Sequence, residues 1–353
     1  MIKSNIRSIR NKVQSKLFKS ISHLRQYLSV PEINTNKAFS HNGQACGVIF
    51  SNNEQLTAMS REDNKIIFKS GEELTFYQYR GQVKHYNFQC SPNIYRTKES
   101  NIFLEICRTV SFENFLAKHP FIQFINSLED NIYINKTALA QHYELKTPYL
   151  DLTSNFDVAS FFATCELING KYKPYKGKEI GIIYRLDETL NHAVQTQEYD
   201  SNFEYIGWQP LPRPEQQRGS TYKLKINENF ANLKYVQSYL FTHSRSQAKN
   251  IWLKFGKGKT LFPKDSTKDV AEIFKNLTSF TRDEINEAKN RFFQWFEGRN
   301  SQDLEKIIQD IEILNSRDNL NWNDYVENGP DYWEKEYIKT ISKISYRNCY
   351  YIN

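Results

Sequence analysis

The sequence of 353 residues lacks any apolar run close to the roughly 18 residues that a membrane-spanning helix needs. Its five cysteines are odd in number and none are spaced as CxxC, which argues against a disulfide framework and against a zinc finger. The 13 glycines and 10 prolines are too few for a collagen-like or low-complexity chain. Hydrophobic residues make up 39%, which is enough to bury a core. We therefore expect a globular protein in a reducing, cytoplasmic setting.

Acidic residues are absent from the first 30 positions, which contain seven of the 47 lysines and arginines. Residues 31–353 contain the other 40 basic residues and all 40 acidic ones, so this part is formally neutral. The net charge of +7 therefore lies in the N-terminal segment. From Ile2 to Leu28 apolar residues recur every three or four positions, which predicts a basic amphipathic helix over residues 1–30. This helix would dock on the body, contact an anionic surface or serve in targeting.

The remaining chain changes character near residue 265. Before this point strand-like and helical patterns alternate with loops, whereas beyond it the patterns are helical and include a capping box of Thr281 and Glu284. We expect a domain over residues 31–262, a helical region over residues 263–353, and an α+β fold with a small, mostly antiparallel sheet flanked by helices. Helices are expected at residues 99–128 with a break at Pro120, 136–145, 155–168, 244–255, 281–296 and 301–314. Strands are expected at residues 74–79, 149–153, 179–186, 222–226 and 235–241, with ordered pieces at 56–59 and 66–68.

The first polar cluster that can carry chemistry ends a predicted strand and consists of Tyr79, Arg80, Gly81 and Gln82. A guanidinium in this place can hold a phosphate or carboxylate through two parallel hydrogen bonds. Glycine beside it lets the backbone approach a ligand closely. The alternative is a structural arginine that joins the end of the sheet to a loop.

The second cluster is residues 138–143 (ALAQHY), where His142 can bind a ligand or orient a neighbouring group. A lone histidine is equally an ordinary buried core residue. In the third cluster, residues 147–155 (TPYLDLTSN), Asp151 lies between two leucines and needs a partner, for which Arg80 or His142 would serve.

The third cluster also leads into a predicted helix. Thr153, Ser154 and Asn155 precede its first turn, whose unpaired N–H groups suit an anion, although the same residues are ordinary caps. The fourth cluster, residues 213–219 (RPEQQRG), places Glu215 and Gln217 in a proline-stiffened loop before a strand. Such a loop is either functional or a plain exposed connection.

Taken in order, these clusters resemble the FRG domain, a bacterial family named after an aromatic-Arg-Gly motif. The resemblance covers about residues 55–260, and the order of its motifs makes it specific. It departs from the family where Tyr149 replaces a usual arginine, Leu152 a usual tryptophan and Arg218 a frequent glutamine, which bears on the substrate rather than the fold. The matching segments are residues 79–82, 91–96 (SPNIYR), 138–143, 147–155, 158–163 (VASFFA), and Arg213 with Gln217 and Gly219.

The resemblance implies a toxin or phage-defence protein whose layout is similar to that of ADP-ribosyltransferases, with NAD as co-substrate. Those enzymes have an Arg or His on a first strand, a Ser/Thr-rich strand leading into a helix, and a Glu or Gln on a late loop. Here the corresponding residues are Arg80, then Thr153 with Ser154, then Gln217, with Glu215 as its neighbour.

The same resemblance assigns roles around the bound NAD. Its pyrophosphate would lie at Arg80 and the helix N-terminus, and Tyr79 or Tyr143 would stack on the nicotinamide. A group on the late loop would stabilise the positive charge that builds on the ribose as the glycosidic bond breaks. The acceptor would be a protein or nucleic acid, and an antitoxin or defence partner is also implied.

Two readings from other classes compete with this one. The first is a nuclease or other phosphodiesterase that uses Arg80, His142 and Asp151, with or without a metal ion. The second is a module that senses a nucleotide or phage component without turnover. In every case we expect Arg80, His142, Asp151, Thr153 and Gln217 to converge on one pocket.

Overall fold

The computed structural model describes residues 17–28, 37–41, 44–49, 56–60, 64–70, 76–86, 90–128, 131–195, 202–297, 304–305, 308, 311–317, 320–326 and 328–345. These residues form a mixed α+β structure whose main sheet has seven strands in the order β1-β13-β10-β6-β7-β12-β11. All neighbouring strands in it are antiparallel except β1 and β13. The expected class, a mainly antiparallel sheet flanked by helices, is therefore confirmed.

The centre of the main sheet is β10 (Gly181–Asp187), which lies between β6 (Tyr77–Gln82) and β13 (Val236–Phe241). Its apolar side chains are buried on both faces, as its continuous apolar pattern predicts. The sheet continues through β7 (Tyr149–Thr153), β12 (Gly219–Lys223) and β11 (Phe203–Tyr205). The register of β7 against β12 places Thr153 opposite Gly219.

One face of the sheet is covered by α6 (Phe156–Thr164). Beside α6 pack α9 (Arg245–Lys254) and α2 (Ile21–Tyr27). On the other face the strands pack against Cys90 and the segment around Phe230. The sheet is thus buried on both faces around β6 and β10.

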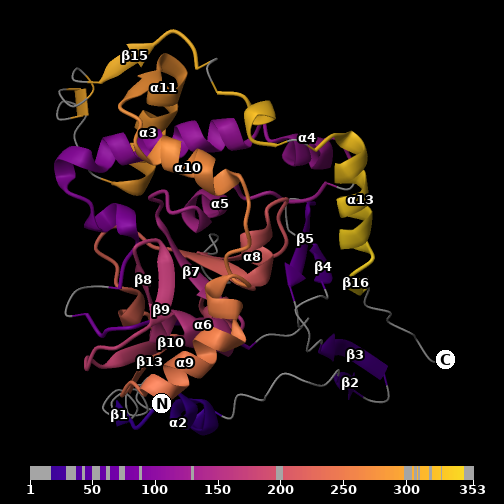
Figure 1. The fold of residues 1–353 in the computed structure, drawn as a ribbon, viewed down its shortest axis with the longest axis vertical. Helices are drawn as coiled ribbons and strands as arrows, with labels where there is room; N and C mark the ends of the chain where they lie inside the picture. The colour runs from indigo at the N-terminus through magenta and orange to yellow at the C-terminus, as the bar shows by residue number, and fades with distance from the viewer. Residues whose placement is uncertain are drawn as a thin grey trace.

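A helical layer lies across one end of the sheet (Figure 1). Its longest member is α3 (Glu99–Leu116), which shares one hydrophobic core with α11 (Arg282–Trp295) and another with α5 (Lys136–His142) and α10 (Thr267–Lys275). The capping box of Thr281 and Glu284 is present as predicted at the start of α11. The division into residues 1–30, 31–262 and 263–353 stays a prediction.

A smaller layer lies beside the helices, where α4 (Pro120–Ser127) and α13 (Pro330–Ile341) pack next to each other (Figure 1). A three-stranded sheet in the order β16-β4-β5 completes it. The remaining strands are β4 (Leu56–Ser60), β5 (Ile66–Ser70), β16 (Ile344–Ser345), β2 (Lys37–His41), β3 (Gln44–Ile49), β14 (Ser279–Thr281) and β15 (Glu312–Leu314). The remaining helices are α7 (Glu188–Gln195) and α8 (Pro212–Gln216), with short 3-10 turns η1 (Asn93–Arg96), η2 (Phe230–Asn232), η3 (Gly256–Gly258) and η4 (Trp322–Asp324). None of the helices in the described ranges is long and apolar enough to cross a bilayer.

Two expected helices end earlier than predicted. The helix expected over residues 155–168 stops at Thr164, and β8 (Cys165–Ile168) forms a hairpin with β9 (Lys171–Pro174). The missed signal is Asn169-Gly170, both at positive φ, which is the two-residue turn that favours a hairpin. Similarly, the end of the helix expected over residues 301–314 is the strand β15, which pairs with β14.

The N-terminal segment also differs from the expected single helix. Leu17–Phe18 forms strand β1, which extends the edge of the main sheet, and α2 starts only after Ser20 caps it. Ile21 and Leu24 are buried against the sheet, and Arg25 pairs with Asp157 of α6. Of the expected roles, docking therefore holds for residues 17–28, while residues 1–16 lie outside the described residues.

Candidate functional site

The neighbouring strands β6 and β7 pair at a single position and diverge from there. They pair only at Tyr79 and Thr153, so the residues that follow in β6 have no backbone partner in β7. Arg80 bridges the gap, because its Nη1 donates to the backbone carbonyl of Asp151 over 2.8 Å. A cavity of about 180 Å³ lies at this separation. It is lined by Tyr79, Arg80, Gly81, Asp151, Leu152, Thr153, Val158, Ala159, Phe162 and Gln217.

Gly81 brings helix α6 close to the sheet. A β-carbon built on Gly81 would overlap the carbonyl oxygen of Ala159 and crowd the side chain of Ala163. Glycine is thus needed here for the packing of α6 on β6, which forms the apolar wall of the cavity. Tyr79 contributes to the same wall and packs edge-on against Phe156 at 5.3 Å between ring centroids.

Thr153 ties the cavity to the late loop. Its Oγ1 donates to the backbone carbonyl of Gln217 over 2.7 Å and accepts the backbone N–H of Asn155 over 3.0 Å. The side chain of Gln217 is held as well, since its Nε2 donates to the carbonyl of Leu261 over 3.0 Å. These bonds fix one edge of the cavity.

Asp151 lines the cavity, and one of its carboxylate oxygens is unpaired. Its Oδ2 accepts from Nε2 of Gln141 at 3.4 Å, and Gln141 is in turn held by the hydroxyl of Thr147. The other oxygen, Oδ1, is buried and has no hydrogen-bond partner among the described residues. Nε of Arg80 is likewise buried and has no hydrogen-bond partner among the described residues. Both atoms are enclosed by the protein and keep unused hydrogen-bonding capacity.

His142 does not line the cavity. It is buried, and its Nε2 has no hydrogen-bond partner among the described residues. Burial lowers the pKa of His142, and the nearby carboxylate of Asp151 only partly offsets this, so the ring is neutral at pH 7. Gly219 leaves room for the ring, because a β-carbon there would lie 3.2 Å from Nε2.

Two residues with expected site roles lie elsewhere. Tyr143 is buried in the core with α3, and Arg213 stacks on its ring at 4.3 Å. Glu215 points to the C-terminal region, where its Oε1 pairs with Nζ of Lys343 at 3.3 Å. Burial raises the pKa of Glu215 despite this lysine. Neither residue lines the cavity.

The N-terminus of α6 is occupied by side chains of the chain itself. Asn155 caps it by accepting the N–H groups of Asp157 and Val158. Asp157 pairs with Arg25 and, at 2.6 Å, with Lys254. Ser154 donates its backbone N–H to Arg218, and neither Ser154 nor Gln82 lines the cavity.

The sequence patterns missed part of this site. Val158, Ala159 and Phe162 form the helical wall, and the spacing of Val158 and Phe162 on one helix face was the signal that could have revealed it. Outside the lining, Asp265 faces Nε of Arg213 at 3.5 Å, a pair that the sequence patterns also missed. Its position in a loop gave no pattern to read.

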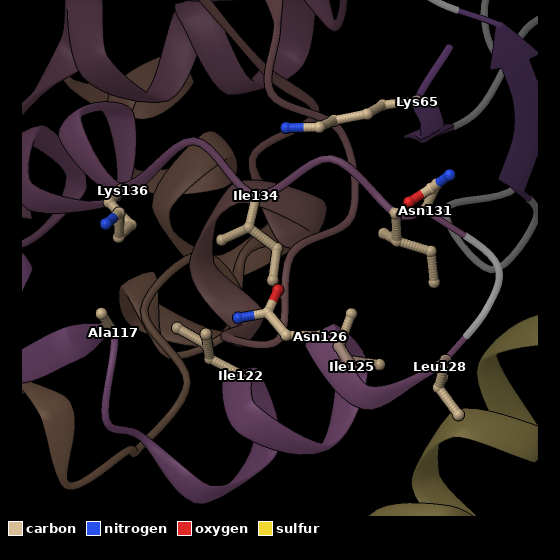
Figure 2. Close-up of a pocket in the computed structure, with 10 residues that line it drawn as sticks. Lys65, Ala117, Ile122, Ile125, Asn126, Leu128, Asn131, Ile134 and Lys136 are labelled. Atoms are coloured by element: carbon tan, nitrogen blue, oxygen red, sulfur yellow. The ribbon is translucent and has the colours of Figure 1, made fainter. Parts of the chain in front are cut away.

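A larger cavity of about 280 Å³ lies elsewhere, between α4 and residues 131–136 (Figure 2). Its floor is apolar, and Lys65 and Lys136 stand at its edge. No acidic residue, histidine or cysteine is among the residues that line it. Because its charged residues are two lysines and it pairs no cation with a carboxylate, we place the candidate site at the smaller cavity, which has both.

The described residues contain no group of three histidine, cysteine or carboxylate side chains that could hold a metal ion. The site they form is an arginine and a carboxylate in a small, partly apolar cavity between two separating strands. It belongs to a mixed α+β fold in which α6, with α2 and α9 beside it, covers one face of the sheet.

The family model of the FRG domain matches residues 75–171, and the chain therefore contains an FRG domain. The matched residues run from β6 through β8 and include every residue that lines the cavity except Gln217. A search of curated proteins and a search of solved structures each give no match.

Proposed function

We propose that the FRG domain of this protein binds NAD at the cavity between β6, β7 and α6 and transfers its ADP-ribosyl group. One observation carries this proposal: Arg80 and Asp151 line the same cavity, and the carboxylate of Asp151 has an oxygen without a hydrogen-bond partner among the described residues. A ligand with an anionic centre and a developing positive charge would satisfy both groups.

The size of the cavity supports a particular placement of the dinucleotide. Its volume of about 180 Å³ is below the range of roughly 300 Å³ and more that is usual for whole ligands. The nicotinamide riboside end would therefore enter the cavity, beside Phe162 and Tyr79. The diphosphate would stay at its mouth, where Arg80 provides charge-assisted hydrogen bonds.

The chemistry requires a group that stabilises a positive charge. When the bond between nicotinamide and the ribose breaks, charge develops on the ribose as in glycoside hydrolysis, and a carboxylate beside it lowers the barrier. Asp151 is the carboxylate that lines the cavity, whereas Glu215 is paired with Lys343. We therefore assign the charge-stabilising role to Asp151 and a positioning role to Gln217.

The test uses NAD labelled on the nicotinamide, incubated with the full chain. Asp151→Asn should keep NAD binding but slow nicotinamide release by about 100-fold or more, as for other losses of electrostatic stabilisation. Arg80→Gln should weaken binding about 10- to 100-fold, because a charge-assisted contact is lost. Asp331→Asn, at an exposed position on α13, is the matched control and should change neither.

Other outcomes select the competing functions. Hydrolysis of RNA or DNA that depends on Asp151 and His142, without NAD binding, would indicate a phosphodiesterase. Nucleotide binding with no turnover under any condition would indicate a sensing module. Either result overturns the transferase proposal.

The setting and the acceptor are part of the same proposal. A transferase of this kind would modify a protein or a nucleic acid and would act as a toxin or in phage defence, restrained by an inhibitory partner such as an antitoxin. Growth arrest on expression that Asp151→Asn relieves would support this setting. Label carried from the adenine side of NAD into protein or RNA would identify the acceptor class.

A further inference from the structure

One stretch of the chain is basic and contains no acidic residue. Between Glu228 and Asp265 the sequence has seven lysines and arginines and no Asp or Glu, although residues 31–353 as a whole are formally neutral. The later part of this stretch forms α9, η3 and the loop that follows them. Five of its basic side chains are exposed and make no ion pair with another described residue. These five, which we call the basic surface, are Arg245, Lys249, Lys257, Lys259 and Lys264.

Two carboxylates next to the basic surface are held by other cations. Asp157, at the start of α6, pairs with Arg25 and with Lys254 of α9. Asp265, which directly follows the basic stretch, pairs with Arg213. Because these carboxylates are already neutralised, they do not compensate the charge of the basic surface.

The hairpin of β8 and β9 lies against α9. Nε1 of Trp252 donates to the backbone carbonyl of Tyr172 in β9 over 2.8 Å. Two exposed lysines flank this tyrosine: Lys173 stands opposite Glu166 in the register of the hairpin, and Lys171 lies next to the turn. The hairpin therefore adds positive charge beside the basic surface.

Aromatic rings accompany these charges. Nζ of Lys257 lies 5.5 Å from the ring centre of Trp252, and the rings of Tyr172 and Phe262 stack with their centroids 4.8 Å apart. All three aromatic side chains are partly exposed. Lysines interleaved with accessible rings are typical of proteins that bind single-stranded nucleic acid, since the lysines contact phosphates and the rings stack on bases.

The same rings adjoin the candidate site. Phe162, which lines the cavity, lies 6.2 Å from Tyr172 and 6.0 Å from Phe262 between ring centroids. The carbonyl of Leu261, next to Phe262, accepts from the side chain of Gln217, which also lines the cavity. A ligand on the basic surface would therefore lie beside the cavity.

A second acid-free stretch meets α9. Nε2 of Gln247 in α9 donates over 3.3 Å to Oγ of Ser20, the N-cap of α2. Residues 17–28, the described part of the acid-free N-terminal segment, thus pack beside α9. The two acid-free stretches of the sequence come together at this side of the molecule.

We propose that the basic surface, together with Lys171 and the rings of Trp252, Tyr172 and Phe262, binds single-stranded nucleic acid. The exposed lysines contact the phosphates, and bases stack on the rings. A duplex offers the same phosphates but keeps its base faces stacked inside, so an unpaired strand is the better partner. This binding needs no NAD and does not depend on the proposed transferase.

The test is fluorescence anisotropy of the full chain with a labelled single strand of about 20 nucleotides, as RNA and as DNA, between about 50 and 200 mM salt. The variant with Lys249→Gln, Lys257→Gln and Lys259→Gln should bind either strand about 10- to 100-fold more weakly at the low salt concentration. Its plot of log affinity against log salt should be less steep by about 2, since each lost phosphate contact contributes about 0.7.

The matched control replaces three exposed lysines away from α9. The substitutions Lys98→Gln, Lys118→Gln and Lys335→Gln lie at the two ends of α3 and on α13, in the layers at the other end of the molecule (Figure 1). They lower the net charge by the same amount, and they should change the affinity less than about twofold. An equal loss in both variants would show a diffuse attraction and overturn the proposal.

Three further results would also overturn it. The first is a full chain that binds neither strand at low salt, and the second is a lysine variant that binds as well as the unmodified chain. The third is tighter binding of a duplex of the same length. Because Leu167 and Leu253 are exposed apolar side chains in β8 and α9, vesicles of phosphatidylserine are a further probe. Vesicle binding that requires the three lysines, without binding of nucleic acid, would assign the surface to a membrane instead.

This inference and the transferase proposal fail separately. Binding of single strands by a chain that never cleaves NAD would keep the nucleic-acid surface and overturn the transferase. Cleavage of NAD by a chain that binds no nucleic acid would do the reverse. Circular dichroism of each variant separates loss of binding from loss of fold, and the three single lysine substitutions serve if the triple variant does not fold.

Discussion

The hydroxyl of Thr153, at the end of β7, donates to the backbone carbonyl of Gln217, 64 positions later in the chain, over 2.7 Å. The same hydroxyl accepts the N–H of Asn155 at the start of α6. One side chain thus joins the FRG domain to the late loop and fixes the edge of the candidate site. The position of the late loop at the site therefore depends on this hydroxyl, and substitution of Thr153 tests its contribution.

We expect Thr153→Val to lower the free energy of unfolding by about 2–3 kcal/mol, because it keeps the shape but leaves a buried carbonyl and a buried N–H without a partner. Thr153→Ser keeps the hydroxyl and should cost about 1 kcal/mol or less, the value of a lost methyl group. Urea denaturation of the two variants measures the difference. Equal stability of both would contradict the role given to the hydroxyl.

Gly81→Ala should destabilise the protein by about 2 kcal/mol or more, because the new methyl group would overlap the carbonyl oxygen of Ala159 and force α6 away from β6. Gly329→Ala is the matched control, since no atom lies within 4 Å of a β-carbon there and its φ of −90° is ordinary. Gly329 is the N-cap of α13, so the cost should be limited to the capping preference, about 1 kcal/mol or less. Thermal denaturation measures the difference in stability between the two variants. Equal stability would mean that α6 shifts to accommodate the methyl group at no cost.

Arg213 and Asp265 form a buried pair, with 5% and 10% of their side chains exposed. Arg213→Met should cost about 3–5 kcal/mol, because Asp265 is left as an uncompensated buried charge. Burial already raises the pKa of Asp265, and Arg213 opposes that rise, so removing the arginine should raise the pKa further. Adding Asp265→Asn to Arg213→Met should recover part of the stability. A double-mutant cycle by urea denaturation measures the coupling, and additive effects would show that the pair does not interact.

His119 should make the stability depend on pH. Burial lowers its pKa to about 4, and its Nδ1 accepts the N–H of Phe121, a bond that protonation would break. Because the unfolded chain binds the proton at about pH 6.5, this contribution is complete above that pH and is lost as pH falls towards the folded pKa of about 4. The loss between about pH 7 and pH 5 should be on the order of 2 kcal/mol.

The matched variant for this prediction is His119→Asn, which can still cap α4 but does not titrate. Its free energy of unfolding should fall less over the same pH interval than that of the unmodified chain. The constant cost of the lost contacts with Trp322 and Trp333 shifts the whole curve and leaves its slope unaffected. Parallel curves for the two proteins would assign the pH dependence to other groups.

Part of the candidate site could be read from the sequence because it consists of short polar segments at element ends. Such segments contain Arg80, Asp151, Thr153 and Gln217, and all four line the cavity. The positions of Tyr143 and Glu215 could not be read in the same way. A tyrosine in an apolar stretch and a glutamate in a loop take whichever surroundings the fold gives them, here Arg213 and Lys343.

The sequence by itself determined the features that depend on neighbouring residues. Thr281 with Glu284 starts α11, Pro120 separates α3 from α4, and the apolar run in β10 marks a buried strand, because capping, a missing N–H and local hydropathy act within a few positions. Only the tertiary structure decided that β6 and β7 separate after one pair and that Arg80 and Asp151 share a cavity. Both features depend on contacts between residues that are far apart in the sequence. Arg80 and Asp151, for example, are joined by a hydrogen bond across 71 positions. Local sequence patterns do not encode such contacts.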